Sequence, residues 1–393
     1  MNATPPLSQA SQPLDLTSRF PGFEDLLAPQ VVIDAAVLDA NIARMSEITA
    51  GKVALYPHVK THKSVAIARM QREAGASGFT AARPNEVAML LANGLGPVTL
   101  AYPTIDECEI RPLVEQCGEG EIRFVADSGV GVAALGQASQ FAGRALSVFI
   151  KVDVGLHRCG VDPQGDAALH LARAISDHPH LRFAGLLSHA GQAYGARNPD
   201  GIRIVAQQEL SLMVALRERL EGNGIPVPDV SVGSTPTLLA NAGFDGVDEV
   251  RPGNYAFLDL TAVRLGIASR NDLALGVSAR IVSANTRYAI ANVGSKTLSS
   301  DLGAHGSATA GSYGEVWLHN DARPFAIEKL SEEHAFIPLD GRTLKVGTPV
   351  LILPNHSCPV ANLSSGLHLL RQGQPSQLLS IHARSNAGGA VCA

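Results

Sequence analysis

Apolar residues follow two alternating patterns between about residue 31 and residue 265 of the chain. In one pattern they recur every three or four positions, as in residues 38–48 and 206–220, which predicts helices with one apolar face. In the other they form short continuous runs, which predict buried strands at residues 53–56, 98–101, 122–126, 146–153, 183–187, 229–232 and 247–250. Strands that alternate with helices are typical of parallel βαβ units, and these runs fit a (β/α)8 barrel better than a small open sheet.

The pattern changes after about residue 271. Strand-like runs at residues 276–282, 287–293, 315–318 and 344–354 are separated by Gly and Pro, with no convincing amphipathic helix between them. The opening of the chain, up to about Ser18, is rich in Pro, Ser and Gln and is typical of a loosely ordered extension. We therefore predict an α/β protein with an extension over residues 1–30 that has room for a first strand of the β domain, a (β/α)8 TIM-type barrel over residues 31–270, and a second, mostly β C-terminal domain over residues 271–393.

The charge balance and the cysteines narrow the class of protein. There are 31 Lys and Arg against 36 Asp and Glu, a net charge of −5, and no basic block that would attract nucleic acid or an anionic membrane. No run of about 18 apolar residues and no basic leader with an apolar core is present, so no membrane segment is expected. The 5 cysteines include no CxxC pair, which favours a reducing compartment without disulfides. We expect a cytoplasmic enzyme.

Polar clusters follow five of the predicted barrel strands. In a barrel the carboxyl ends of the strands and the loops after them meet on one face, where catalytic groups gather. The clusters are PHVKTHK at residues 57–63, VGLHRCG at 154–160, SHAGQAY at 188–194, GSTPT at 233–237 and RPGNY at 251–255. Five strand ends therefore deliver ionisable or Gly-rich groups to the same rim.

Two of these clusters suggest a phosphate site, and a third adds a nucleophile. The Gly-Ser-Thr and Gly-Asn-Tyr loops offer backbone N–H groups and hydroxyls without bulk, as a phosphate requires, although such loops also make ordinary turns. A desolvated lysine is a good Schiff-base nucleophile, and Lys60 or Lys63 could serve, although most loop lysines are simply solvated. A phosphate-bearing aldehyde would use both features, and pyridoxal phosphate is such an aldehyde.

Five segments together carry a resemblance to a known family. They are PHVKTHK, VDVGLHRCG, SVGSTPT, RPGNYAFLD and PNHSCPVANL, in this order along the chain. The chain resembles the D-threonine aldolase and D-serine dehydratase family of pyridoxal phosphate enzymes, the barrel-type class that also contains alanine racemase. The resemblance runs from about Val31 to about Leu370.

The resemblance implies a role for particular residues. It implies that Lys60 carries the cofactor, that Arg158 approaches the pyridine nitrogen, and that His189 and Tyr194 lie beside the ring on the substrate side. The phosphate would be held by the two loops that contribute Gly233, Ser234, Thr235, Gly253, Asn254 and Tyr255. A C-terminal HxC or HxD motif binds a divalent metal in this family, and here it is His356 and Cys358.

The chemistry of this pair bears on the metal. Residues at i and i+2 of an extended segment point to the same side, so His356 and Cys358 can ligate one ion. Thiolate and imidazole favour Zn²⁺, whereas a carboxylate in place of the thiolate would suit Mn²⁺ or Mg²⁺. Two protein ligands leave coordination positions open for water and substrate oxygen, as a catalytic site requires.

Two reactions share this scaffold according to the resemblance. One is β-elimination from a β-hydroxy D-amino acid, such as D-serine, D-threonine or D-3-hydroxyaspartate, to a 2-oxo acid and ammonia. The other is retro-aldol cleavage to glycine and an aldehyde. The HxC motif and the SVGSTPT loop favour the dehydratase. An amino-acid racemase, which needs no metal, and a non-catalytic cofactor carrier remain as less favoured alternatives.

Two further expectations concern substrate size and assembly. A β-carboxylate on the substrate would need an extra cation, and the sequence does not place Arg83 or Lys296 in the pocket. Enzymes of this barrel class usually form symmetric dimers, so the resemblance implies a homodimer.

Overall fold

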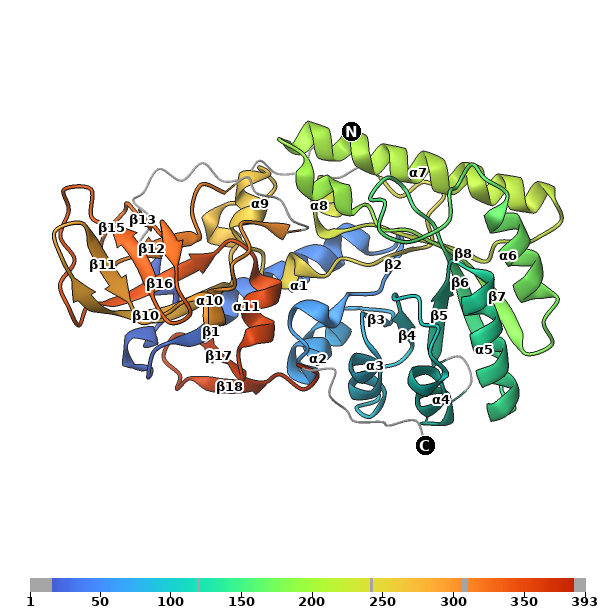
Figure 1. Ribbon diagram of the computed structural model, residues 1–393, viewed down its shortest axis with the longest axis horizontal. Coiled ribbons are helices and arrows are strands. Elements are labelled where there is room, and N and C mark those ends of the chain that lie inside the picture. Colours follow the sequence, from blue (N-terminus) through green and yellow to red (C-terminus); the bar gives the residue numbers. More distant parts are fainter. Residues whose placement is uncertain (1–15, 117, 119–120, 241–242, 305–309, 385–393) are drawn as a thin grey trace.

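The computed structural model describes residues 16–384 except 117, 119–120, 241–242 and 305–309. Two bodies lie side by side in Figure 1: a barrel with helices around it, and a β-sheet domain formed mainly by the C-terminal part of the chain. Most of the predicted N-terminal extension, residues 1–15, lies outside the described residues.

The barrel sheet contains eight described strands, all parallel, in the order β2-β9-β8-β7-β6-β5-β4-β3. They are β2 (Ala54–Leu55), β3 (Phe79–Ala81), β4 (Val98–Leu100), β5 (Ile122–Ala126), β6 (Leu146–Lys151), β7 (Leu181–Leu187), β8 (Asp229–Val232) and β9 (Glu249–Val250). A parallel bridge between His58 and Thr80 joins the two ends of this sheet, so the sheet nearly closes on itself. The predicted (β/α)8 barrel is confirmed. The strand that sequence reasoning missed is β3, whose three residues are too few to show a pattern.

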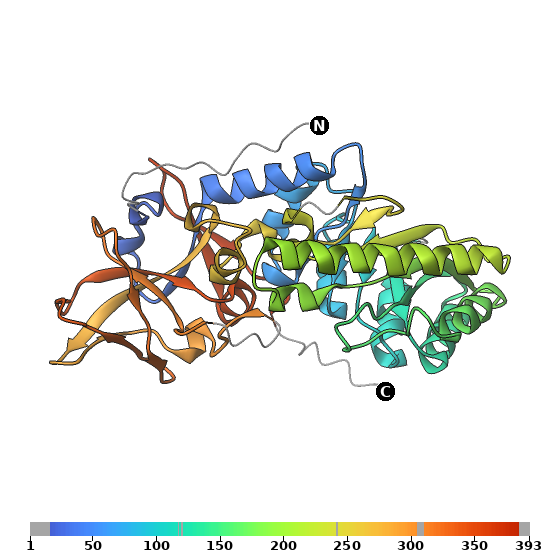
Figure 2. The same ribbon diagram turned by 90° about the horizontal axis from the view of Figure 1, so that it is seen from above.

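Helices surround the barrel strands, as Figure 2 shows for the long α7. They are α1 (Ala35–Thr49), α2 (Val65–Glu73), α3 (Pro84–Leu91), α4 (Glu107–Gln116), α5 (Gly129–Ala142), α6 (Ala167–Ser176), α7 (Pro199–Gly222), α8 (Thr235–Leu239) and α9 (Leu260–Arg264). Both helices predicted from apolar spacing form, as α1 and α7. Each begins at a side chain that caps free backbone N–H groups: Asp34 accepts from Ala36 and Val37, and Asn198 accepts from Gly201.

The second body is a mostly antiparallel sheet, as predicted. Its described elements are β10 (Leu275–Ala284), β11 (Tyr288–Ala291), α10 (Ser295–Leu298), β12 (Gly314–Trp317), β13 (Phe325–Ala326), β14 (Lys329–Leu330), β15 (Ala335–Pro338), β16 (Pro349–Pro354), α11 (Ser357–Leu363), β17 (Gly366–Leu370) and β18 (Gln377–Ser380). The two helices have 4 and 7 residues, too short for a visible periodicity, which explains why the sequence predicted none here.

One strand joins this sheet from the other end of the chain. Strand β1 (Gln30–Asp34) pairs antiparallel with β10 and parallel with β17. The predicted boundary after residue 30 therefore falls inside β1, and residues 31–34 belong to the second sheet rather than to the barrel. An apolar run indicates a buried strand but does not say which sheet buries it. The chain then passes directly into α1 of the barrel at Asp34.

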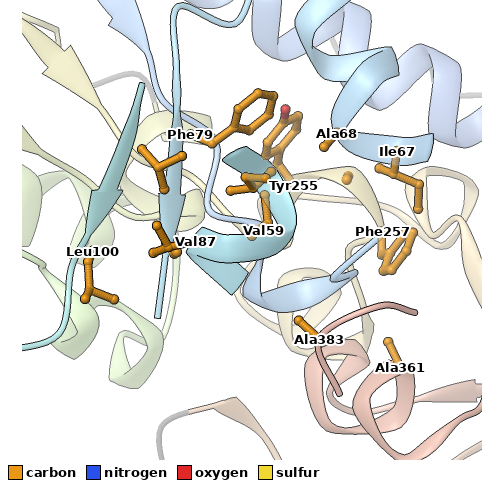
Figure 3. Close-up of a cluster of buried hydrophobic side chains, with 14 of the residues drawn as sticks. Val59, Ile67, Ala68, Phe79, Val87, Leu100, Tyr255, Phe257, Ala361 and Ala383 are labelled. Atoms are coloured by element: carbon orange, nitrogen blue, oxygen red, sulfur yellow. The ribbon is translucent and has the colours of Figure 1, made fainter. Parts of the chain in front are cut away.

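A cluster of buried apolar side chains joins the barrel to α11. Figure 3 shows Val59, Phe79, Tyr255 and Phe257 of the barrel in this cluster, together with Ala361 of α11. All of these are nearly or fully buried. Because each square ångström of buried apolar surface contributes about 25 cal/mol, this packing holds the loop after β2 firmly against the second domain. The loop that carries the predicted cofactor lysine and the helix that carries the predicted metal motif are thus parts of one core.

Two expectations about the whole chain can be compared with the structure. Cys108 in α4 is disulfide-bonded, so the expectation of no disulfide is wrong; counting cysteines does not reveal which of them approach in space. Cys159 and Cys358 are free. In the part of the chain that the structure describes, no helix combines the length and apolar character needed to cross a membrane.

Candidate active site

The loop after β2 presents Lys60 at the mouth of the barrel. Lys60 lies in a short 3-10 helix, Val59–Thr61, whose first and last residues are buried and fix the backbone. The His58 N–H donates to the carbonyl of Pro252 over 2.9 Å, which ties this loop to the loop after β9. Burial lowers the pKa of Lys60 from its ordinary value, with Cys358 opposing and Arg158 reinforcing the shift. A neutral amine at this position is a competent nucleophile and base.

Lys63, the other candidate for the nucleophile, is engaged elsewhere. Its backbone has a φ of 48°, in the left-handed region, and its side chain turns toward α11. The ammonium donates to Oδ1 of Asn362 over 2.8 Å and lies 3.4 Å from Oε1 of the buried Glu86. The geometry therefore favours Lys60 over Lys63 for attachment of a cofactor.

The predicted residues gather around one cavity of about 240 Å³. Its lining comprises His58, Lys60, His189, Tyr194, Ser234, Thr235, Arg251, Gly253, Asn254, Ala304, His356 and Cys358. A smaller pocket of about 30 Å³ shares part of this wall and adds Ala101, Lys151, Arg158 and Gly233. The structure thus brings together all the predicted site residues except Tyr255.

Tyr255 lies outside both pockets, contrary to the expectation that it faces the phosphate. Its ring is buried in the apolar cluster of Figure 3, and its hydroxyl accepts a hydrogen bond from Nε2 of Gln71 over 2.9 Å. Its neighbours Gly253 and Asn254 do line the cavity. The aromatic ring, a large apolar group with one polar atom, is satisfied by the core and a single amide, so the sequence motif located the loop but misassigned this side chain.

The two small-residue loops follow the neighbouring strands β8 and β9 and contribute residues to the lining of the two pockets. Gly233 has a φ of 96°, which favours glycine, and the Ser234 N–H donates to Oγ1 of Thr237 over 2.9 Å. A Cβ on Gly253 would lie 3.1 Å from Cβ of His58, so glycine allows the loop after β9 to approach the loop after β2 closely. Among the described residues that line the two pockets there is no Asp or Glu, whereas two Lys and two Arg are present. Hydroxyls, small loops and an excess of cations fit an anionic phosphate.

Three further residues of the site were not singled out by sequence reasoning. Arg251 is buried and donates from Nη1 to Ser231 Oγ and from Nη2 to the Ser188 carbonyl. Burial and the charge of Arg251 lower the pKa of Lys151 to about 7. Burial, with the charge of Lys60, also lowers the pKa of His58 well below its usual range. A signal was present for Lys151, because lysine is rarely fully buried and this one stands inside an otherwise apolar strand.

Tyr194 and His189 stand on the wall next to the phosphate loop. Tyr194 belongs to a 3-10 helix, Gly191–Gly195, after β7, and lines the cavity together with Thr235. Burial raises the pKa of Tyr194 above its usual range, with Thr235 opposing. The phenol is therefore protonated at neutral pH and acts as a hydrogen-bonding hydroxyl rather than as a base.

The pair His356 and Cys358 lines the same cavity from the start of α11. His356 is extended and caps α11, while Cys358 lies in the first turn of that helix, so the two converge at the start of a helix and not along an extended segment as predicted. The sulfur of Cys358 lies 3.2 Å from Oγ1 of Thr61, in the loop that carries Lys60. Burial alone raises the pKa of the Cys358 thiol, but His356 and the charge of Lys60 outweigh it and the net shift is downward. A thiol that ionises readily beside an imidazole is a donor set suited to Zn²⁺.

The chemistry of this wall fits a metal site with open positions. Within the described residues, no group of three or more His, Cys, Asp or Glu side chains is placed to hold an ion, so this pair would supply two protein ligands. A hydrogen-bonded network connects it to the phosphate end. Ser357 donates from its N–H to Oδ2 of Asp259 over 2.9 Å and from Oγ to Oδ1 of Asn254 over 2.5 Å. Asn254 in turn donates to Asp259 over 2.8 Å.

Comparison with known proteins finds one family model that matches the barrel and another that matches the second domain. The family model of the alanine racemase N-terminal domain matches residues 33–261, and that of a serine dehydratase domain matches residues 274–370. The chain belongs to the alanine racemase-type barrel family. The resemblance inferred from the five sequence motifs is thus confirmed.

Three relatives span nearly the whole chain. D-threo-3-hydroxyaspartate dehydratase of Delftia sp. (strain HT23) is 35% identical over 84% of this chain and 90% of that protein. D-serine dehydratase of Dictyostelium discoideum is 27% identical over 88% and 94%, and D-threonine aldolase of Arthrobacter sp is 25% identical over 97% of each. A cysteine-to-alanine mutant of D-threo-3-hydroxyaspartate dehydratase, solved in the metal-free form, superposes with a TM-score of 0.84 at 31% identity and covers 91% of this chain and 98% of that one.

Proposed function

We propose that the chain is a pyridoxal phosphate- and metal-dependent lyase that eliminates the hydroxyl group of a β-hydroxy D-amino acid, giving a 2-oxo acid and ammonia. The observation that carries this proposal is the cavity itself. One volume of about 240 Å³ is lined by Lys60, by small residues of the loops after β8 and β9, and by the pair His356 and Cys358. Two of the three relatives named above are dehydratases of β-hydroxy D-amino acids and the third is a D-threonine aldolase, which supports a lyase acting on such a substrate.

Each wall of the cavity has a task in this proposal. Lys60 attaches the cofactor, while Gly233, Ser234 and Thr235 bind the phosphate together with the backbone at residues 253–254. His356 and Cys358 hold the metal, for which we propose Zn²⁺ because of the thiolate. When bound, pyridoxal phosphate supplies an electron sink for the α-carbon and the metal supplies positive charge for the departing hydroxyl oxygen.

Lys60 is also our candidate for moving the α-proton. Burial lowers the pKa of this amine, which favours the neutral form in which Nζ can accept a proton from the α-carbon. His189 and the neutral hydroxyl of Tyr194 line the same cavity and orient the substrate. The buried walls keep bulk water from the reacting carbon.

Two guanidinium groups could face the pyridine nitrogen. Arg158, the residue predicted for this role, is exposed, although it lines the smaller pocket. Arg251 is buried and oriented by two hydrogen bonds, to Ser231 and Ser188. A fixed, desolvated donor controls the electronic state of a ring better than a mobile one, so we assign the ring nitrogen to Arg251 and the substrate carboxylate to Arg158.

The size of the substrate depends on where further cations lie. Arg83 stacks on the ring of Tyr102 at 4.5 Å, and Lys296 pairs with Glu333 at 2.9 Å on the surface, so neither lines the described cavity. Lys151, Arg158 and Arg251 do line the smaller pocket. A substrate with a second carboxylate, such as a D-3-hydroxyaspartate, therefore finds positive charge in the barrel mouth without either residue.

The test is a full product analysis with zinc-loaded holoenzyme. D-serine, D-threonine and D-threo-3-hydroxyaspartate are each incubated with the enzyme, and ammonia, 2-oxo acid, glycine and aldehyde are measured together. We expect ammonia and 2-oxo acid, both lost with a chelator or in Cys358→Ala. Glycine with aldehyde would establish the aldolase, which the Arthrobacter relative makes the second candidate. Metal-independent interconversion of D- and L-amino acids would establish a racemase, and no turnover with retained cofactor would favour a carrier.

The proposal includes a symmetric homodimer in the cytoplasm. Exposed apolar side chains such as Tyr102, Ile105 and Val130 follow strands β4 and β5 at the barrel mouth, where a partner subunit could cover them. Light scattering at micromolar concentration measures the assembly directly, and a monomer there would refute this part of the proposal.

A further inference from the structure

The ring of the proposed metal ligand His356 has a carboxylate partner, Asp301. Its Nδ1 lies 2.9 Å from Oδ2 of Asp301, within hydrogen-bond distance. The His356 side chain is 18% exposed and that of Asp301 48%, so the pair lies at the edge of the cavity wall rather than free in solvent. Neither sequence motif nor pocket lining identifies Asp301.

The contact gives the two ring nitrogens of His356 different roles. With Nδ1 engaged by Asp301, the nitrogen left for Cys358, or for an ion beside Cys358, is Nε2. The two nitrogens of an imidazole point away from each other, so Asp301 cannot ligate the ion that Nε2 binds. A carboxylate on Nδ1 instead keeps the proton there, so that the Nε2 lone pair is available to the metal.

The backbone around this contact is fixed by one guanidinium. Arg264, the last residue of α9, donates from Nη1 to Oδ1 of Asn355 over 3.0 Å and from Nη2 to the carbonyl of Leu302 over 3.3 Å. It thus holds the residue before His356 and the residue after Asp301 at the same time. The N–H of Asp301 also donates to Oγ of Ser299 over 3.1 Å. These bonds set the separation between Asp301 and His356 independently of their own contact.

We propose that Asp301 is a positioning residue for the metal site: by holding Nδ1 of His356, it fixes the tautomer and the ring orientation with which Nε2 meets a divalent cation beside Cys358. This inference rests on the proposed function, which places the metal on His356 and Cys358. Partners of this kind typically change metal affinity by roughly 10- to 100-fold.

The experiment measures metal affinity in the full-length holoenzyme. Zn²⁺ affinity is determined by competition with a chromophoric chelator for the wild type, Asp301→Ala, Asp301→Asn and the control Asp200→Asn. Asp200 is a solvent-exposed carboxylate of α7 that pairs with Arg203, so the control removes the same charge elsewhere. We expect Asp301→Ala to weaken Zn²⁺ binding by roughly 10- to 100-fold, Asp301→Asn to weaken it less because its amide oxygen still accepts from Nδ1, and Asp200→Asn to leave it unchanged.

A second readout separates positioning from a structural role or from direct ligation. With Co²⁺ as the probe, the thiolate-to-metal band reports Cys358, and the ligand-field bands report the number of ligands. We expect Asp301→Ala to retain both at saturating Co²⁺, and the metal-free variant to unfold at the wild-type temperature. Unchanged Zn²⁺ affinity in Asp301→Ala would overturn the inference, as would a lower coordination number. If the wild type itself shows no Co²⁺–thiolate band, the proposed metal site fails and the inference fails with it.

Discussion

The barrel side of the cavity and the side formed by residues 355–358 are built by different means. On the barrel side, Lys60 and the phosphate loops follow directly from strand ends, and the strands fix them through backbone hydrogen bonds. On the other side, His356 and Cys358 begin a helix of only 7 residues that is held by side chains from α9 and the loops before it. The proposed cofactor site therefore depends on the barrel as a whole, whereas the proposed metal site depends on a few individual hydrogen bonds.

The largest effect should come from the barrel side. Lys60→Ala removes the amine that attaches the cofactor and accepts the α-proton, so activity should fall by roughly 10²- to 10⁴-fold or more. The visible absorption of the bound cofactor should be lost as well. Lys63→Met is the matched control, because Lys63 binds Asn362 and Glu86 outside the cavity. If Lys63→Met removed the absorption and Lys60→Ala retained it, the assignment of Lys60 as the cofactor lysine would be wrong.

A second effect on the barrel side concerns stability as a function of pH. The pKa of Lys151 is lowered to about 7 in the folded protein from an ordinary value of 10.5, so between these values the unfolded chain binds more protons. The folded state should therefore gain up to ~1.4 kcal/mol per pH unit from this group as the pH rises from 7 toward 10.5.

Lys151→Met should abolish this contribution. The variant should be more stable than the wild type near pH 7, and the difference should shrink toward pH 10. Urea unfolding at pH 7, 8.5 and 10 measures it, with the exposed Lys345→Met as the control. Parallel pH profiles for the wild type and Lys151→Met would show that the buried amine carries no such penalty.

A smaller effect should come from the hydrogen bond between Ser357 and Asn254, which joins the proposed metal site to the proposed phosphate site. Ser357→Ala leaves Oδ1 of the buried Asn254 without its donor, which costs about 1–2 kcal/mol, or a factor of about 5–30 in affinity. Because Asn254 belongs to the phosphate end and Ser357 to the metal end, binding of both cofactor and Zn²⁺ should weaken. Titration of each measures this, and Ser364→Ala, just beyond the far end of α11, is the control. A loss confined to one of the two would show that the sides are independent.

The smallest effect tests the residue that the motif misassigned. Tyr255→Phe removes only the hydrogen bond from Gln71, so the free energy of unfolding should fall by about 1 kcal/mol and cofactor affinity should not change. The control is Tyr288→Phe, which loses a bond to Glu328 near the surface. A tenfold loss of cofactor affinity in Tyr255→Phe would restore the sequence-based assignment.

Local sequence patterns predicted much of the barrel because its strands are buried on both faces and read as continuous apolar runs. Two features were less clear. Strand β3 has only three residues, one of them a polar Thr, and is too short to stand out; the extension expected to have room for a first strand of the β domain ends at residue 30, whereas β1 runs from Gln30 to Asp34 and pairs with β10 and β17. Pairing between strands that are hundreds of residues apart depends on the folded chain and leaves no local mark.

The candidate site likewise combines features that the sequence predicts with features that only the folded structure shows. Lys60, the glycine-rich loops and the pair His356 and Cys358 could be named from the sequence, because motifs preserve residue type and spacing. The orientation of Tyr255, the burial of Arg251 and the engagement of Lys63 by Asn362 could not, because each depends on what surrounds a side chain. Asp301 lies 55 positions before His356, and no pattern connects them.

By itself the sequence determined a two-part α/β architecture and the chemical groups available to it, because apolar periodicity and residue type are local properties of the chain. Only the tertiary structure decided which of those groups share a cavity, which lysine is desolvated and which carboxylate meets His356. The physical reason is that pKa shifts, ligand geometry and hydrogen-bond partners are set by distances between residues far apart in the chain, and those distances exist only after the barrel and the second sheet have packed against each other.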